Sequence, residues 1–361
     1  MERKLASVRK IEEIKKIEGA DKIVAYRVDG WWVVDSIDKY KVGDLVIYIE
    51  PDAWVPTELA PFLTKGKAPR EYNGVKGEKL RTVKLRGQIS QGLLLPLNDQ
   101  MIISANLTEI VFEKFDDVEG MDVTEKLGIQ KWEPTIAENM RGLIKSTFPS
   151  FIRKTDQERI QNIKHRDLEQ HKNDMFEVSI KLDGTSFTAY NRDGEVGVCS
   201  RNQDLKLEGN DSNVYVGFAL RTKILEFLLF HGKNIAIQGE LMGPGIQDNR
   251  EGLNEVKLFV FDVFNIDTGS YMNHGERINL LADLKKYMAN VHNTMNYDTI
   301  QSIPIMSVGN KIGDNTVETF LADAEGKSLN HPVREGIVWK SITDPGFSFK
   351  AISNVFLLGE K

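Results

Sequence analysis

The run from Phe176 to Asp183 alternates strictly between apolar and polar side chains. A period of two predicts a β-strand whose two faces meet different surroundings. The buried face would carry Phe176, Val178, Ile180 and Leu182, and the other face Glu177, Ser179, Lys181 and Asp183. Because Gly184 follows, we expect the strand to end in a turn, with a lysine and a carboxylate at its end.

The half of the chain that contains this run, residues 175–361, mixes strand and helix patterns. Helical patterns are predicted at 212–230, 276–289 and 315–324, and further strands at 235–237, 257–264, 336–340 and 347–351. This order predicts an α+β domain of antiparallel sheets with flanking helices.

The first half of the chain contains short strand patterns separated by turns. The predicted strands are 23–28, 31–34, 45–49, 80–86 and 92–96, with Asp29-Gly30 as a hairpin turn between the first two. Residues 80–86 alternate between apolar and basic, so we expect this strand to be half-buried. Several short strands at this spacing favour a small OB-like β-barrel over residues 1–130. Residues 131–174 are predicted to form a helical connector.

Charge and composition exclude several classes. Lys+Arg 47 against Asp+Glu 53 gives a net charge of −6, which argues against a globally basic nucleic-acid coat protein but leaves a local basic groove open. The sequence contains no apolar run of roughly 18 residues, so we expect no membrane span. The single cysteine, Cys199, excludes an intramolecular disulfide and an all-cysteine zinc site, and fits a cytoplasmic location.

Lys181 is a candidate covalent nucleophile. A lysine amine has an ordinary pKa of about 10.4, so nearby positive charge or burial must lower the pKa before the amine can attack. A metal-bound nucleotide would supply such charge. The alternative is a surface strand that ends in an Asp-Gly turn, and these four residues alone do not separate the two.

Further strand ends carry the groups that nucleotidyl transfer needs. Three carboxylates could hold a hard metal, basic groups could bind phosphates, and an aromatic strand could stack on a base. For each there is a plainer alternative: a solvated turn at Arg201, for example, or core packing at Phe259. The candidates are Asp183, Arg201, Glu240, Phe259, Glu335, Lys340 and Lys350.

Five collinear motifs resemble those of the covalent nucleotidyltransferases, which include ATP-dependent ligases and mRNA capping enzymes. The resemblance covers roughly residues 145–361. It rests on Lys181-Leu182-Asp183-Gly184, Gln238-Gly239-Glu240, Phe259 to Asp262, Glu335-Gly336-Ile337-Val338 and Ser348-Phe349-Lys350. It implies an ATP-grasp-like nucleotidyltransferase (adenylyltransferase) domain after the OB-like barrel.

Within this superfamily the chain most resembles the template-directed RNA ligases with an N-terminal OB-like domain. The stretch Lys154-Thr155-Asp156…Arg159 contributes to this likeness. Lys350 lies close to the C-terminus, and the spare domain stands at the front, unlike DNA ligases and capping enzymes. One departure is Ile352, where several relatives have a second lysine. Either Lys350 does both jobs, or Lys340 supplies the other charge.

The resemblance implies a mechanism with ATP and with Mg²⁺ or Mn²⁺ as cofactors. Lys181 would form lysyl-AMP, the AMP would pass to the 5′-phosphate of an RNA end, and a 3′-hydroxyl would then displace it. Asp183, Glu240 and Glu335 would hold the metal, partly through waters. Lys340 and Lys350 would neutralise phosphates. Ile180, Arg201 and Phe259 complete the expected nucleotide site, with Lys181, Glu240, Lys340 and Lys350.

The expected partner is RNA, and the local charge of the first half of the chain favours it. Basic residues dominate from Thr64 to Arg86, and Lys84 and Arg86 are the expected RNA contacts, for ends that meet at a duplex nick. No protein partner is implied. The alternatives are a DNA ligase, a capping-type enzyme and a non-catalytic nucleic-acid-binding module.

Overall fold

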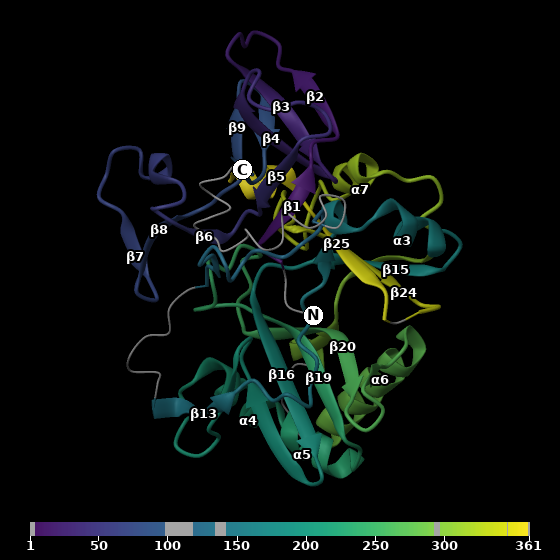
Figure 1. Ribbon diagram of the computed structural model, residues 1–361. Helices are drawn as coiled ribbons and strands as arrows, with labels where there is room; N and C mark the ends of the chain where they lie inside the picture. The colour runs from purple at the N-terminus through teal and green to yellow at the C-terminus, as the bar shows by residue number, and fades with distance from the viewer. Residues whose placement is uncertain (1–3, 98–117, 134–141, 292–296, 345, 360–361) are drawn as a thin grey trace. The chain divides into compact units, whose positions relative to one another are not determined.

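The computed structural model describes residues 4–97, 118–133, 142–291, 297–344 and 346–359. The chain divides into two compact units, Met1–Thr135 and Ile136–Lys361 (Figure 1). Most of the range predicted as a helical connector belongs to the second unit, and there it contains short strands as well as one short helix. Among the described residues, no helix has the length and apolar character that crossing a membrane requires.

The first unit is built from small antiparallel sheets. Two apolar clusters fill it, one around Ile47 and Ile49 and the other around Tyr26 and Trp31. The sheets, in strand order, are β1 (Ala6–Lys10), β5 (Leu45–Ile49) and β11 (Leu93–Pro96); β2 (Glu13–Lys16), β3 (Ile23–Val28) and β4 (Trp31–Ser36); β12 (Gln130–Lys131), β6 (Ala53–Pro56), β8 (Val75–Lys79) and β7 (Arg70–Tyr72); and β10 (Gln88–Ser90) with β9 (Val83–Leu85).

The predicted hairpin at Asp29-Gly30 is present. Val28 pairs with Trp31, and Asp29 has a φ of 49°. A two-residue turn with positive φ matches the right-handed twist of the strands that it joins.

The predicted half-buried strand 80–86 is wrong. Instead β9 forms a hairpin with β10 across Arg86 and Gly87, both of which have positive φ. Val83 and Leu85 are 43% and 41% exposed. The alternation of apolar and basic residues therefore does not mark a buried face here, because the turn residues make this segment one arm of an exposed hairpin.

The second unit contains two larger sheets. One has the order β13 (Ile144–Thr147), β18 (Gln203–Leu205), β17 (Glu195–Cys199), β16 (Thr185–Arg192), β19 (Ile235–Met242), β20 (Lys257–Asn265) and β21 (Ser270–Tyr271), with β22 (Ile300–Ser302) also paired to β20. The other has the order β14 (Glu158–Arg159), β25 (Ser348–Ile352), β24 (Gly336–Ser341), β15 (Phe176–Lys181) and β23 (Ile305–Asn310).

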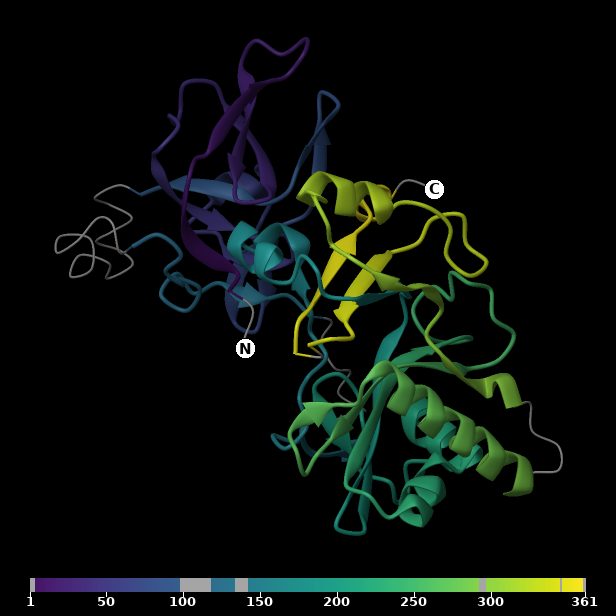
Figure 2. The ribbon, with the colours of Figure 1, turned by 90° about the vertical axis from the view of Figure 1, so that its right-hand side faces the viewer.

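Helices of the second unit pack against these sheets, and Figure 2 shows the long green helix α6 (His274–Val291) running along the larger one. One apolar cluster joins the larger sheet to α4, α5 and α6, and another packs Phe176 and Val178 against Phe320 of α7. Among the described residues, the helices are α3 (His165–Gln170), α4 (Val214–Thr222), α5 (Ile224–His231), α6 (His274–Val291), α7 (Val317–Asp323) and α8 (Asn354–Leu358), and the 3₁₀ turns are η1 (Pro61–Thr64), η4 (Ile160–Asn162) and η5 (Tyr297–Thr299).

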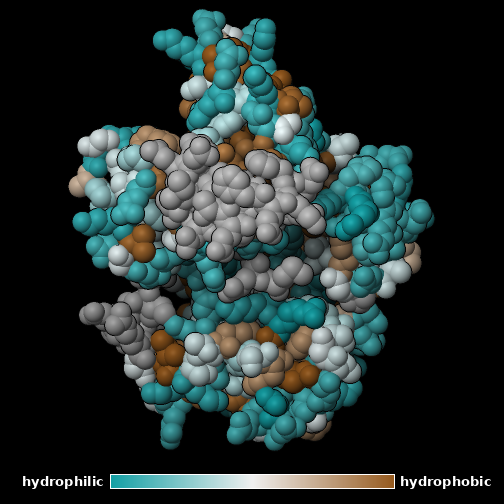
Figure 3. Space-filling view, viewed as in Figure 1, coloured by the Kyte–Doolittle hydropathy of each residue, from teal (hydrophilic) through white to brown (hydrophobic). Residues whose placement is uncertain are grey.

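The helix predicted at 212–230 is divided in two. Lys223 adopts a left-handed conformation that ends α4 and begins α5, and Asn213, not Ser212, caps the start of α4. Leu229 and Phe230 of α5 are exposed, and hydrophobic residues are visible among hydrophilic ones on the face of the second unit shown in Figure 3. Scattered exposed apolar side chains are normal on globular proteins.

The inner faces of the two sheets meet at a small shared apolar cluster. Ile180 and Leu182 come from the end of β15 and its turn, and Met242 and Phe259 come from β19 and β20. Beside this cluster, polar groups also connect the sheets: the Gly184 N–H after β15 bonds Glu240 of β19, and Lys340 of β24 pairs with Asp262 of β20. The residues from separate sequence motifs therefore gather between the two sheets.

Candidate active site

Lys181 lies at the end of β15, beside a carboxylate from the neighbouring strand. Its cross-strand partner is Gly336, so Glu335, which precedes β24, lies next to it. The Lys181 Nζ donates a hydrogen bond of 2.7 Å to Glu335 Oε2, and both side chains are mostly buried. The structure thus joins the first and fourth motifs directly.

Glu240 reaches this place from β19 in the other sheet. Its Oε1 accepts a hydrogen bond of 3.0 Å from the Gly184 N–H. A Cβ at position 184 would lie 2.5 Å from the Leu241 carbonyl oxygen, so only glycine fits there. This close approach fixes the turn after the nucleophile strand against the strand that carries Glu240.

The carboxylates control the charge of the lysine. Burial would lower the pKa of the Lys181 amine, but Glu335, Glu240 and Asp183 outweigh burial and hold the pKa above its ordinary value. Burial raises the pKa of the Glu240 carboxyl to about 7, with Glu335 and Asp183 adding to the effect against the Lys181 charge. Negative charge is therefore in excess around Lys181, which favours the protonated amine.

The three predicted metal ligands surround Lys181, yet they are not close enough to one another to coordinate one metal ion directly. Among the described residues, no three His, Cys, Asp or Glu side chains stand close enough together to hold a metal ion. Arg250 also approaches Asp183, with 3.8 Å between Nη1 and Oδ2. The set fits a hydrated Mg²⁺ or Mn²⁺ contacted through its waters, because Mg²⁺ dehydrates reluctantly and usually keeps several waters.

Lys350 and Arg201 are joined by a residue to which the sequence analysis gave no role. Asp156 Oδ1 lies 3.2 Å from Lys350 Nζ, and Asp156 Oδ2 lies 3.1 Å from Arg201 Nη2. Lys350 belongs to β25 and Arg201 follows β17, so this carboxylate links the two sheets. Two cations expected to bind phosphate or ribose thereby converge on one anion.

Arg159 is a second residue without a predicted role. It pairs with Lys350 in the parallel ladder between β14 and β25, so both side chains leave the sheet on the same face. Arg159 is only 4% exposed. Its signal lay in the stretch Lys154 to Arg159, which the resemblance included without assigning any residue a task.

Lys340 lies elsewhere. Its Nζ pairs with the Asp262 carboxylate and donates a hydrogen bond of 2.9 Å to the Phe261 carbonyl oxygen. Both of these partners are protein groups on β20, and the phosphate role of Lys340 stays a prediction.

The aromatic strand also differs from its predicted geometry. Phe259 is 3% exposed and packs among Leu182, Met242 and Ile303, so neither ring face is open to a base. Phe261 is partly exposed and packs beside Ile180, whose N–H bonds the Pro304 carbonyl. A register shift opposite Gln238 and Gly239 makes Phe261 a bulge residue, so the strand does not keep a strict period of two at this point.

In the first unit, Lys84 and Arg86 lie on the hairpin of β9 and β10. Both side chains are exposed, Lys84 on β9 and Arg86 in the turn. The hairpin presents them to solvent, as a nucleic-acid contact would require.

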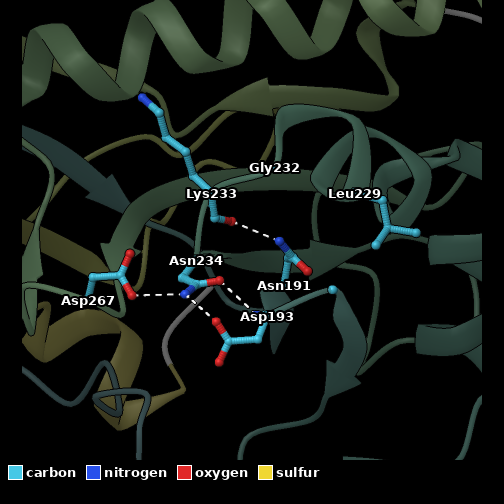
Figure 4. A pocket seen from close by; sticks show the side chains of 8 residues that line it. Asn191, Asp193, Leu229, Gly232, Lys233, Asn234 and Asp267 are labelled. Carbon is cyan, nitrogen blue, oxygen red and sulfur yellow. Dashed lines mark hydrogen bonds between the residues drawn. The ribbon is translucent and has the colours of Figure 1, made fainter.

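A cavity of about 460 Å³ lies away from Lys181, at the opposite end of β16 from Thr185. Figure 4 shows the Asn234 side chain at its centre, between Asp193 and Asp267. The Asn234 amide donates to both carboxylates at 2.9 Å, and its oxygen accepts from the Asp193 N–H at 2.8 Å. These contacts hold the turn between β16 and β17 in place.

Comparisons with known proteins agree with this geometry. The model of an OB-fold domain matches residues 5–97, and that of the RNA ligase family matches residues 174–352. The fold class predicted from the sequence, an OB-like domain before a nucleotidyltransferase domain, is confirmed. No match was found among the curated proteins.

Solved structures of an RNA ligase from Naegleria gruberi resemble the chain over almost its whole length. A complex with PPi and a variant with AMP and Mn are each 40% identical, with a TM-score of 0.84, and 98% of each chain is covered. A variant with ATP and Mn is 39% identical with the same TM-score and coverage. Five motifs, two domains and this likeness agree, and the chain belongs to the RNA ligase family.

Proposed function

We propose that the protein is an ATP-dependent RNA ligase that joins 3′-hydroxyl and 5′-phosphate RNA ends through a lysyl-AMP intermediate. The observation that carries the proposal is the Lys181 amine at a strand end, hydrogen-bonded to Glu335 and surrounded by Asp183 and Glu240. One carboxylate is enough to balance the charge of a structural lysine. The presence of three around Lys181 therefore favours a functional site. The likeness to a ligase solved with ATP, AMP and Mn supports the same chemistry here.

In the first step, Lys181 Nζ attacks the α-phosphorus of ATP. A P–N bond forms, the bond from that phosphorus to the bridging oxygen of pyrophosphate breaks, and pyrophosphate leaves. Before the attack, one Nζ proton passes to Glu335 Oε2, its hydrogen-bond partner, and a second proton goes to solvent once the P–N bond has formed. Glu335 thus lies where it can both orient the amine and accept its proton.

The two later steps move AMP from the lysine to the RNA end and then displace it. An oxygen of the RNA 5′-phosphate attacks the lysyl-AMP phosphorus, which frees Lys181 and leaves AMP on the RNA end. The 3′-hydroxyl of the other end then attacks the 5′-phosphate phosphorus, a phosphodiester bond forms, and AMP departs. Neither step needs a free lysine nucleophile at its start.

Asp183, Glu240 and Glu335 would hold Mg²⁺ or Mn²⁺ through its waters. When bound, the metal neutralises phosphate charge and favours the unprotonated amine. The carboxylates themselves keep Lys181 at the end of β15 and set the excess negative charge that attracts a cation.

The phosphate and base contacts follow from which side chains face the space between the sheets. Lys350 and Arg201, which share Asp156, are the proposed cations for phosphate and ribose, and Arg159 adds charge beside Lys350. Phe261 replaces Phe259 as the proposed stacking partner of adenine, because its side chain is partly exposed.

We propose RNA ends at a duplex nick as the substrate, and RNA repair in the cytoplasm as the setting. The exposed Lys84 and Arg86 of the first unit support contact with RNA phosphates. The lone thiol, Cys199, is buried, and burial and Asp204 raise its pKa. It therefore stays protonated, which suits a chain that uses no disulfide.

The decisive experiment incubates the protein with α-labelled ATP or GTP and Mg²⁺. Covalent label from ATP supports the ligase, label from GTP alone would indicate a capping-type enzyme, and no label would indicate a binding module. Sealing of nicked duplexes with RNA or DNA at the nick then separates an RNA ligase from a DNA ligase. A single-stranded RNA control tests whether a bridging strand is required.

A further inference from the structure

Lys340 forms a buried link between the two sheets of the second unit. It comes from β24, whereas its two partners, the Asp262 carboxylate and the Phe261 carbonyl, come from β20. Asp262 is 1% exposed. A charge buried to this degree is costly without its partner, so each member of the pair depends on the other.

A second link lies beside the first. Arg277 of α6 donates from Nη2 to the two Glu177 oxygens, at 2.8 Å and 2.7 Å, and from Nη1 to the Phe261 carbonyl oxygen at 3.1 Å. His274 also contacts Glu177. Burial would raise the pKa of Glu177, but Arg277 and His274 outweigh it, so the pKa lies below its ordinary value and the carboxylate stays charged.

The two links share one acceptor atom and one pair of cross-strand partners. The Phe261 carbonyl oxygen accepts from both Lys340 and Arg277, and Glu177 is the cross-strand partner of Lys340. Phe261 is also the bulge residue of β20. Lys340 and Arg277 thus bind the backbone of β20 at its bulge. The same residue, Phe261, carries the ring that we propose to stack on the base.

The sheet register places Lys340 farther from Lys181 than Lys350 is. Lys181 pairs with Gly336, whereas Lys340 stands opposite Glu177, about 14 Å along the strand at roughly 3.4 Å per residue. Lys350 pairs with Val338, about 7 Å along by the same spacing, and its strand β25 lies about 4.8 Å farther from β15 than β24 does, which leaves Lys350 the nearer of the two. Lys350 is therefore the nearer cation to a phosphorus bonded to Lys181.

We propose that Lys340, Asp262, Arg277 and Glu177 form an inter-sheet pin, a positioning element that holds the Phe261 bulge against the nucleophile strand, and that Lys340 serves the pin and not the phosphates of ATP. This inference rests on the proposed function, since it concerns the nucleotide that Lys181 attacks. It changes the task of Lys340 from charge neutralisation to placement of the base-binding strand.

A double-mutant cycle tests the pin. K340Q and D262N each leave one buried charge without its partner, and each should slow nucleotide labelling by about tenfold or more. The double variant K340Q/D262N replaces the ion pair with two amides, so it should label faster than either single variant. If Lys340 bound phosphate directly, the double variant would label more slowly than K340Q, and the pin would be refuted.

A binding measurement separates base placement from phosphate contact. By calorimetry, K340Q should weaken AMP binding several-fold while leaving pyrophosphate binding within about twofold of the unmodified protein. K350Q is the matched control and should weaken pyrophosphate binding. Equal loss of pyrophosphate affinity in K340Q and K350Q would overturn the proposal.

Folding and the proposed function are controlled separately. Thermal unfolding identifies any variant that fails to fold, and K340R, which keeps a cation within reach of Asp262, then replaces K340Q and should retain most of the labelling. Absence of label in the unmodified protein would refute the ligase. The AMP and pyrophosphate affinities of K340Q and K350Q would still show whether Lys340 belongs to the inter-sheet pin.

Discussion

Two charged clusters lie on the same face of β15, and they differ in how their charge is balanced. At Lys181, one ammonium meets three carboxylates, with Arg250 at the edge near Asp183. In the inter-sheet pin, four residues away at Glu177, two cations meet two carboxylates in nearly complete burial. One cluster has surplus negative charge, and the other is neutral overall apart from His274.

The difference separates chemistry from structure. A buried cluster that serves only the fold must pair its charges, because an unpaired buried charge costs several kcal/mol. A surplus of like charge is tolerated where a ligand supplies the missing countercharge, so perturbed pKa values gather at such sites. The raised pKa of Glu240, about 7, belongs to the first kind of cluster, and the lowered pKa of Glu177 to the second.

The largest expected effect comes from removing the lysine of the first cluster. K181A should abolish covalent nucleotide labelling, because the described face of β15 has no other amine. The same variant should still seal RNA that already carries a 5′-adenylate, since that step needs no nucleophilic lysine. Labelled K181A protein would remove Lys181 as nucleophile, and loss of the last step in a folded variant would argue against the three-step scheme.

Removing a carboxylate should have the next largest effect. E240A and E335A should each lower the rate of metal-dependent labelling by about a hundredfold or more, as expected for loss of a charged contact to a metal or its waters. Rates measured across a Mg²⁺ series are the test. A near-native rate at limiting Mg²⁺ would assign that residue to the fold.

Neutralising one carboxylate should change the free energy of unfolding in opposite directions in the two clusters. E177Q leaves Arg277 without its buried partner and should lower the free energy of unfolding by about 3–5 kcal/mol. E240Q relieves repulsion among carboxylates, so its stability should equal or exceed that of the unmodified protein. Denaturant titration at pH 8 without divalent metal measures both, and equal destabilisation would erase the distinction between the clusters.

The smallest effect is expected for cations that belong to neither cluster. K84E/R86E should slow the sealing of a nicked RNA duplex more than labelling, because exposed cations of the first unit contact RNA phosphates in this proposal. Each lost contact should reduce the magnitude of the salt slope by about 0.7 to 0.9. Labelling and sealing rates across a salt series are compared, and equal loss of both would connect the hairpin to the ATP step.

Local patterns predicted most elements and their order. The alternation from Phe176 to Asp183 identified β15 and its faces, and Asp29-Gly30 identified a hairpin. Such features depend on neighbours within a few residues, so the sequence expresses them directly. Where the local pattern contained a hidden turn, as at Arg86-Gly87 and Lys223, the predictions of a half-buried strand and a continuous helix were wrong.

Contacts between distant segments could not be predicted in the same way. Asp156 joins Arg201 to Lys350, and the bulge at Phe261 depends on the register between β19 and β20. Lys340 looked like a phosphate ligand because it ends a motif strand. Its partner Asp262 lies on another sheet, and no spacing within either motif shows that they meet.

The sequence by itself determined which chemistry this protein carries: a lysine at a strand end, three carboxylates and two further lysines, in an order that identifies the family. The tertiary structure decided how those charges are divided. Side-chain identity is local, but charge pairing depends on which sheet faces which. Only the folded chain therefore distinguishes the surplus of carboxylates at Lys181 from the balanced pin that holds Lys340.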